Sequence, residues 1–267
     1  MSWLTAAFAW QSRAVMGRHV RLYFGDWPIK VLPPALEPVT MLLAFGLGLG
    51  AYMSSIEWRG REVSYLSFVA PGMIAYAAFM TPFFQALFSA FIRMHYQRTW
   101  EGQLTTQIEM SHVVWGEILW AAVLGTLYAC IVALVLAGLS LAGVVSFELI
   151  RLPLVAPLAF LAGCAFASIA LLFTALVPTI DHMNLPIFLV IIPLGFASAT
   201  YFPIQHPALV AAATLNPLYH LAEGLRGLLL GGPVAYHLAA LLVLSLVTIA
   251  VLVPLDMRLL RKRVLGE

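Results

Sequence analysis

Six long stretches without a charged residue dominate the sequence and restrict what it can fold into. They are 19 to 41 residues long and cover 178 of the 267 residues: 38–56, 63–92, 118–147, 152–180, 182–222 and 227–255. A helix of about 20 apolar residues crosses the hydrocarbon core of a bilayer. Polar and apolar residues do not alternate in these stretches, as they do in membrane β-barrels. The sequence therefore predicts an all-α protein with several membrane spans.

Composition excludes other classes of protein. Apolar residues make up 62% of the chain and charged residues 10%, against about 45–50% and about 25% in soluble domains. The net charge of +2 is too small to attract nucleic acid. Cys130 and Cys164 lie in apolar stretches and predict neither a disulfide nor a metal site. The sequence has no G-x-x-x-x-G-K-S/T motif, so an ATP-driven function needs another subunit to bind the nucleotide.

The pattern predicts six transmembrane helices in one domain, residues 1–267. We place the spans at about 35–53, 64–92, 118–142, 152–177, 185–202 and 234–255. Pro71–Gly72 and Pro82 are expected to interrupt the second span. If both termini are cytoplasmic, ten Lys and Arg residues lie inside and four outside. This asymmetry favours that orientation, because cytoplasmic loops are enriched in basic residues.

Two segments are not predicted to span. Residues 1–30 combine Arg with Trp3 and Trp10, which favours an interfacial N-terminal helix over an ordinary cytoplasmic tail. Residues 203–232 read as two short helices, 207–214 and 218–230, broken at Asn216–Pro217. We predict an external re-entrant hairpin here; the alternative is a seventh, kinked span. Glu223 and Arg226 are three residues apart in its second helix and are expected to form an ion pair.

The longest cytoplasmic loop is predicted at residues 93–117. Its centre reads Arg98, Thr99, Trp100, Glu101, Gly102, Gln103 and Leu104. A short amphipathic helix here is well placed to receive force from a cytosolic partner; the alternative is a solvated turn. Glu117 is expected to cap the third span, because an acid is favourable at a helix N-terminus.

This loop and four further pieces carry a resemblance to a known family. The pieces are Leu36-Glu37-Pro38, Ala70-Pro71-Gly72, Gly116-Glu117, and Leu215-Asn216-Pro217-Leu218 with Leu225-Arg226. Their order and spacing over nearly the whole chain resemble permeases of type-two ABC exporters, of the polysaccharide and lipo-oligosaccharide class. Within that class the sequence looks most similar to the nodulation-factor exporter permeases.

The resemblance implies a homodimer in a bacterial cytoplasmic membrane, joined by two copies of a cytosolic, NodI-like ABC ATPase. ATP and Mg would be bound by that ATPase, and this chain would bind no cofactor. The region 99–110 would be the coupling helix, and the N-terminal helix would gate lateral entry of a lipid-linked sugar. The implied function is export of a lipo-oligosaccharide or other lipid-linked glycan, by a subunit that is not itself an enzyme. Drug and other lipid exporters share this outline.

Single residues complete the predicted sites. Tyr76, Phe84, Phe88 and Phe91 of the second span are expected, with Glu37, Trp3 and Trp10, to form a gate or substrate path. Packing or lipid contact is the alternative for these aromatic residues. Gly46 and Gly50 form a G-x-x-x-G pair, which favours either a dimer contact or packing within the subunit. The spacing of His206, His220 and His237 predicts no metal site.

Two other functions are weighed against transport by an ABC permease. An intramembrane enzyme needs a nucleophile or an acid–base pair in a wet cavity, and the predicted spans hold almost no ionisable residues. An ion-driven transporter usually places Asp, Glu or His at the membrane midplane. Only the predicted hairpin at 203–232 offers broken helices, and it is expected to lie to one side of the membrane.

Overall fold

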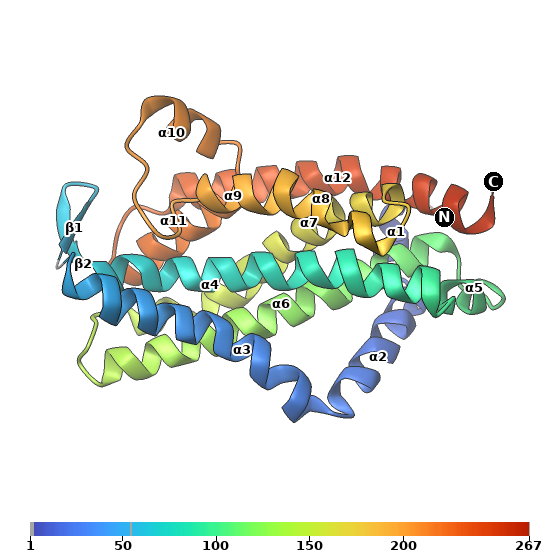
Figure 1. The fold of residues 1–267 in the computed structure, drawn as a ribbon, viewed down its shortest axis with the longest axis horizontal. Helices are drawn as coiled ribbons and strands as arrows, with labels where there is room; N and C mark the ends of the chain where they lie inside the picture. Colours follow the sequence, from blue (N-terminus) through green and yellow to red (C-terminus); the bar gives the residue numbers. More distant parts are fainter. Residues whose placement is uncertain (1–2, 54, 267) are drawn as a thin grey trace.

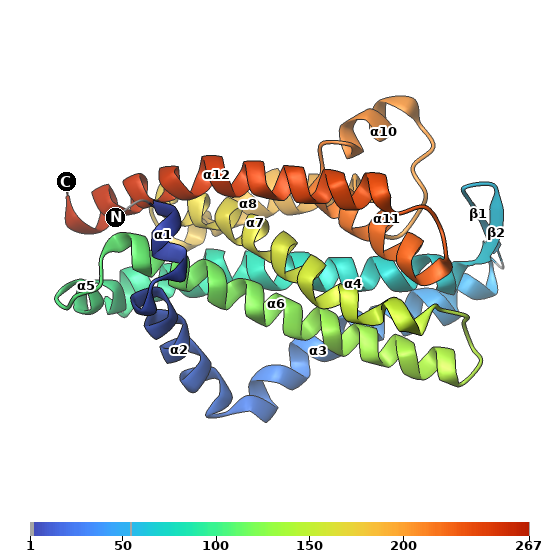
Figure 2. The same ribbon diagram turned by 180° about the vertical axis from the view of Figure 1, so that it is seen from behind.

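The computed structural model describes residues 3–53 and 55–266. The side chains of residues 33–35, 38, 47 and 51 are outside this description, so Pro38 of the predicted first-span motif is too. Among the described residues, four helical segments are long and apolar enough to cross a membrane: Tyr65–Tyr96, Met110–Leu141, Leu149–Leu176 and Ala235–Leu265. They lie side by side in one bundle (Figures 1 and 2). The protein is therefore a helical membrane protein, as the sequence predicts.

The long helices of the bundle are named by their regular parts. They are α4 (Tyr65–Phe84), α6 (Met110–Leu141), α7 (Val155–Leu176) and α12 (Ala235–Leu265). Two π-helical turns, Gln85–Ser89 and Ile92–Tyr96, extend α4, and a 3₁₀ helix, Leu149–Leu154, precedes α7. Aromatic residues fill the contact of α4 with α7, where the ring centroids of Phe79 and Phe166 lie 4.7 Å apart.

The predicted first and fifth spans are also helical. The first is α3 (Trp27–Leu43), continued by a π-helical turn, Ala44–Gly48, and a 3₁₀ turn, Leu49–Ala51. The fifth is the stretch Ile180–Phe196, built from a 3₁₀ helix (Ile180–Met183), α8 (Asn184–Pro186), a π-helical turn (Ile187–Ile191) and α9 (Ile192–Phe196). Its 17 residues give a helix of roughly 26 Å, slightly shorter than the hydrocarbon core.

The two ends of the bundle differ in what they carry. Both termini and α5 (Thr99–Leu104) lie at one end. At the opposite end lie a hairpin of β1 (Ser55–Trp58) and β2 (Arg61–Ser64), and the helices α10 (Pro207–Ala213) and α11 (Pro217–Leu230) (Figure 1). The two short helices predicted in 203–232 are therefore present. We call these the α5 end and the hairpin end.

The hairpin is a difference from the all-α prediction. Ile56 and Trp58 of β1 are buried, whereas Ser55 and Glu57 are exposed, so the strand alternates as a half-buried strand should. Arg59 (φ 52°) and Gly60 (φ 75°) form its two-residue turn, with positive φ at both positions. Such a turn matches the twist of paired strands.

Several helix boundaries also differ from the prediction. α4 continues through Pro71 and Pro82 instead of being interrupted. The Pro82 ring packs against α6 at Gly125, where an added Cβ would lie only 2.6 Å from Pro82 Cδ. α6 begins at Met110, eight residues before the predicted third span, because Glu109 and His112 cap it reciprocally.

The N-terminal segment is likewise more divided than predicted. Residues 1–30 do not form a single helix: α1 (Trp3–Phe8) and α2 (Trp10–Phe24) are followed by α3, which already begins at Trp27. α2 packs against α6, and α2 and α3 diverge as a V from their common corner (Figure 1).

Candidate functional site

A buried carboxylate at the α5 end connects four segments of the chain. Glu117 Oε1 accepts hydrogen bonds from Arg93 Nε (2.9 Å) and Trp100 Nε1 (3.0 Å), and Glu117 Oε2 accepts from Arg93 Nη2. His19 Nε2 lies 3.2 Å from Glu117 Oε1. These residues, which we call the Glu117 cluster, belong to α2, the turn after α4, α5 and α6. The cluster therefore fastens α5 to the bundle.

The prediction that Glu117 caps a helix is wrong. Because α6 begins at Met110, Glu117 lies in its interior with its side chain 1% exposed, and Glu109 is the N-cap. A buried carboxylate is tolerated only when paired and hydrogen-bonded, and Arg93 supplies both. The residues of the cluster were not linked by the sequence, since no short spacing relates them.

The seven residues predicted to couple to an ATPase differ in their exposure: one is buried, and the others are half-buried or exposed. Trp100 is fully buried, and its indole points to Glu117. Arg98, Glu101 and Gly102 are exposed, and Thr99, Gln103 and Leu104 are half-buried. The helix ends at Leu104 and does not reach residue 110 as predicted, because Thr105 and Thr106 turn back to bond the carbonyls of Gly102 and Gln103. α5 thus presents a short polar surface on a fixed base.

A cavity of about 670 Å³ is bordered by α2, α3, α4 and α6. We call it the aromatic cavity. Its lining residues come from α2, α3, α4 with its first π-helical turn, and α6: Tyr23, Lys30, Glu37, Tyr76, Ala77, Met80, Thr81, Phe84, Gln85, Phe88, Ser89, Leu124 and Tyr128. Pockets of this volume, mostly apolar with a few polar groups, are typical of ligand sites.

Rings and hydroxyl groups give the aromatic cavity its chemistry. Phe84 and Phe88 stack on each other, with centroids 5.6 Å apart and planes 12° apart. The hydroxyls of Tyr23 and Tyr128 bond each other and lie 3.0 and 3.2 Å from the carbonyl oxygen of Lys30. Burial raises the pKa of Tyr23, which the bond with Tyr128 offsets only in part. The hydroxyl is therefore a neutral donor at the corner of the V.

Four of the residues predicted for a gate or substrate path line this cavity: Glu37, Tyr76, Phe84 and Phe88. Phe91 does not, although it was expected on the same helix face. It is buried and contacts His95 and Arg263. The reason is the π-helical turn at Gln85–Ser89, because one wider turn rotates every residue after it.

Trp3 and Trp10 also lie outside the aromatic cavity. Trp3 stacks on Trp115 with centroids 6.4 Å apart, and its carbonyl accepts the Trp115 indole N–H at 2.7 Å. Trp10 is 57% exposed and borders a separate hollow formed by Thr105, Thr106, Gln107 and Ile108. The two tryptophans therefore join the N-terminal helices to the region around α5.

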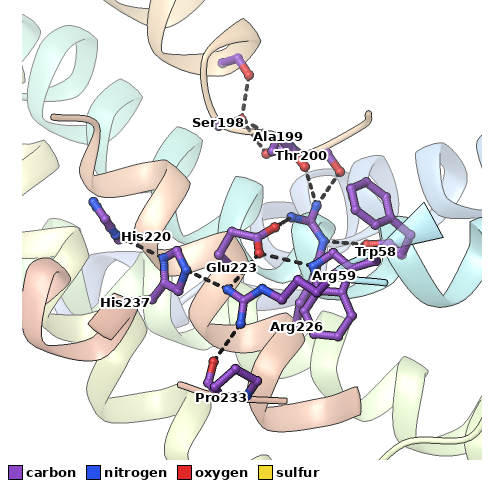
Figure 3. A network of polar contacts seen from close by, with 12 residues as sticks. Trp58, Arg59, Ser198, Ala199, Thr200, His220, Glu223, Arg226, Pro233 and His237 are labelled. Carbon is purple, nitrogen blue, oxygen red and sulfur yellow. Dashed lines mark hydrogen bonds and ion pairs between the residues drawn. The ribbon is translucent and has the colours of Figure 1, made fainter. Parts of the chain in front are cut away.

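A second polar network lies at the hairpin end (Figure 3). Arg226 of α11 is fully buried and its Nη1 donates to Glu223 Oε1 at 2.6 Å, so the predicted ion pair is present. Arg226 Nε donates to the Phe68 carbonyl at 2.8 Å, and Nη2 donates to the carbonyls of Ala199 and Thr200. One guanidinium thus joins α11 to α4 and to the turn after α9.

Glu223 extends this network to the β-hairpin. Its Oε2 accepts from Trp58 Nε1 at 3.1 Å and from Arg59 Nη2 at 3.2 Å. Burial opposes the charged form of Glu223, but Arg226, Arg59 and the Trp58 bond outweigh it and hold its pKa below the usual value. Arg59 also donates to the Pro233 carbonyl at 2.8 Å, which helps to hold its left-handed backbone. We call these residues the Glu223 network.

Two histidines, His220 and His237, complete the Glu223 network, and the donor and acceptor of each of their hydrogen bonds can be assigned (Figure 3). Arg59 has only donors, so His237 Nε2 accepts at 2.6 Å. The Thr214 carbonyl only accepts, so His220 Nε2 donates at 2.9 Å. The two Nδ1 atoms lie 3.1 Å apart. In the hydrogen bond between them, His237 Nδ1 is then the donor and His220 Nδ1 the acceptor. No group of three or more possible metal ligands occurs among residues 3–53 and 55–266.

The remaining predicted residues have local roles in the structure. Asn216 Oδ1 caps α11 by accepting from Leu218 N at 2.9 Å, and Pro217 opens the helix. Asn216 Nδ2 donates to the carbonyls of Leu194 and Ala197. Gly46 faces Leu66 of α4, which is packing within the subunit, whereas the space around Gly50 is open in this single chain.

Comparison with known proteins agrees with this arrangement. Residues 34–253 match the family described as ABC-2 family transporter protein. The chain is 36% identical to nodulation protein J of Rhizobium leguminosarum bv. trifolii over 236 residues, covering 86% of this chain and 84% of that protein. It is 34% identical to nodulation protein J of Sinorhizobium fredii over 262 residues, covering 96% and 95%. A more distant nodulation protein J, from Azorhizobium caulinodans, is 26% identical over 242 residues, covering 90% and 91%.

Proposed function

The chain belongs to the ABC-2 family of transporter proteins, and from this membership we propose that it is the permease of an ATP-driven exporter for a lipid-linked glycan. The cargo class follows the resemblance to nodulation-factor permeases: a lipo-oligosaccharide or a similar amphiphile. The chain would work as a homodimer with two copies of a cytosolic, NodI-like ABC ATPase, in the bacterial cytoplasmic membrane. ATP and Mg would be bound by the ATPase.

The way α5 is held carries the proposed mechanism. Trp100 inserts into the Glu117 cluster while Arg98, Glu101 and Gly102 remain exposed at the end of the bundle. An ATPase that binds this exposed surface would push on a helix fastened to both α6 and, through His19, α2. Closure of the ATPases on ATP would thus reach the V of α2 and α3 directly.

The aromatic cavity supports the proposed path of the cargo. Aromatic rings bury large apolar areas while tyrosine hydroxyls form hydrogen bonds, and a glycan offers both apolar ring faces and hydroxyl groups. Phe84, Phe88 and Tyr76 would contact the sugar, and Glu37 would accept from its hydroxyls. The acyl chain of the cargo would remain in lipid.

The proposed topology has six spans with both termini in the cytoplasm. The α5 end then faces the cytoplasm, the hairpin end faces outward, and 203–232 is an external re-entrant hairpin. This agrees with the placement of both termini at the same end of the bundle. It also places the buried Arg226 near the outer surface, where an arginine costs less than at the midplane.

Co-purification from the native membrane tests the proposal. The tagged chain is solubilised mildly, and a P-loop ATPase in roughly equal amount is expected with it. The pair should hydrolyse ATP with vanadate sensitivity and, in inverted vesicles, should take up a lipo-oligosaccharide only with ATP. Uptake without nucleotide would contradict the proposal and favour ion-driven transport. ATP-dependent uptake of drugs but not of the lipo-oligosaccharide would contradict the proposed cargo.

A further inference from the structure

A smaller pocket adjoins the aromatic cavity toward the α5 end. It has a volume of about 280 Å³ and shares Tyr23, Lys30, Gln85 and Ser89 with the cavity. Arg18 and Arg93 line it together with Lys30. We call it the basic pocket, because no Asp or Glu is among its lining residues.

The three cations of the basic pocket differ in how they are neutralised. Arg93 is paired with Glu117. Arg18 Nη1 is shielded from solvent and has no hydrogen-bond acceptor among the described residues. Lys30 Nζ donates to the Leu22 carbonyl at 2.6 Å, and its nearest carboxylate, Asp26 at 3.4 Å, is 72% exposed. Arg18 therefore has no carboxylate partner in the part of the chain that the structure describes, and Lys30 is paired with an exposed carboxylate.

Neutral donors complete the lining. Ser89 Oγ donates to Gln85 Oε1 at 3.0 Å, so the side-chain N–H groups of Gln85 remain for another acceptor. A buried donor without an acceptor is unfavourable, and a ligand oxygen would remove that cost. A guanidinium, an ammonium and an amide around one pocket are the groups that bind phosphate and sulfate oxygens.

We propose that the basic pocket binds a phosphate-type oxyanion between the guanidinium of Arg18 and the ammonium of Lys30. The volume is many times the roughly 30 Å³ of a water molecule, so a phosphate ester fits. Because the pocket shares four lining residues with the aromatic cavity, the ester group can be the headgroup of an anionic lipid whose glycerol would lie toward that cavity. Free phosphate offers the same chemistry.

Thermal unfolding of the purified, delipidated chain in neutral detergent tests this site. A ligand that binds the folded state raises the unfolding midpoint in a concentration-dependent way. Three probes are titrated: short-chain phosphatidic acid, the matching diacylglycerol without phosphate, and inorganic phosphate. Arg18→Gln is compared with Arg21→Gln, which removes the same charge from an exposed position on the same helix. Native mass spectrometry of the chain with phosphatidic acid gives a second, independent measurement.

We expect phosphatidic acid to raise the midpoint and diacylglycerol to leave it unchanged. The half-saturating concentration should increase at least tenfold in Arg18→Gln and in Lys30→Gln, and remain unchanged in Arg21→Gln. The same response to inorganic phosphate would identify a free anion as the ligand and would still support the proposed site. Equal responses to diacylglycerol, equal losses in Arg18→Gln and Arg21→Gln, or no response to any probe would overturn it.

Discussion

The indole N–H of Trp100 donates to Glu117 Oε1 at 3.0 Å, and this bond joins a six-residue helix to a 32-residue one. Because Arg93 and His19 contact the same carboxylate, a displacement of α5 reaches α2, α4 and α6 at once. Short helices are marginal by themselves, so the position of α5 depends on this cluster.

Replacing Glu117 by Gln should destabilise the chain. Arg93 would keep a buried charge without a carboxylate, and breaking such a pair costs about 3 kcal/mol or more. Glu148→Gln is the matched control, because the side chains of Arg151 and Glu148 are 40% and 41% exposed, so their pair should contribute less than about 1 kcal/mol. Unfolding in detergent measures both variants. Equal effects would contradict a buried pair at Glu117.

Replacing Glu101 by Lys should uncouple ATP hydrolysis from transport. Glu101 is exposed on α5, so membrane insertion and stability should be unchanged. Stimulation of the partner ATPase by the permease should be lost, because the new charge faces the proposed interface. Asp181→Lys, an exposed acid outside α5, is the control. Normal export by Glu101→Lys would show that α5 is not the coupling element.

Replacing Phe88 by Ala should weaken handling of the cargo. Phe88 stacks on Phe84 at the wall of the aromatic cavity, and one stacked ring contributes about 1 kcal/mol. The efficiency of glycan uptake by vesicles should fall about fivefold, while basal ATP hydrolysis remains. Phe188→Ala removes a ring that is 68% exposed and should leave uptake intact. If both variants transport alike, the cavity is not on the path.

Replacing Arg226 by Lys should destabilise the hairpin end, although lysine retains the positive charge. An ammonium cannot reach Glu223 and the carbonyls of Phe68 and Thr200 together, as the guanidinium does. We expect a loss of about 3 kcal/mol. Arg151→Lys, in the exposed pair at the same end, should change stability by about 0.5 kcal/mol at most. Protection of α11 against proteolysis should fall only in Arg226→Lys.

Replacing Gly125 by Ala should loosen the contact of α4 with α6. The new Cβ would lie 2.6 Å from Pro82 Cδ, and a proline ring cannot move aside. Overpacking of this kind costs about 1–3 kcal/mol. Gly138→Ala on the same helix meets nothing within 4 Å, so it should be neutral or slightly stabilising. Unfolding midpoints of the two variants decide the matter, and a stable Gly125→Ala would contradict the close approach.

The charge-free stretches predict the helices well because each stretch consists of consecutive residues and can be recognised without knowing the fold. The predicted start of the third span was wrong because Glu109 and His112 cap α6 at an earlier residue. The prediction for Phe91 was wrong because one π-helical turn rotates it away from the cavity. The hairpin was missed because its turn is Arg59–Gly60, not the Asn-Gly or Asp-Gly that signals such turns. The Glu223–Arg226 pair was predicted, since three residues separate its members. Glu117 with Trp100, and Arg59 with Glu223, are contacts between distant segments that no spacing reveals.

The Glu223 network also has a consequence for biosynthesis. Every acceptor of Arg226 precedes it in the sequence, so this side chain finds its partners as soon as α11 is made. Arg59 is made early, but its acceptors follow 164 to 178 residues later. A nascent chain must therefore keep Arg59 in water until residues 223–237 have been made. Closure of the hairpin onto α11 and α12 can only follow the synthesis of these helices, and a chain that stops before residue 217 cannot make it.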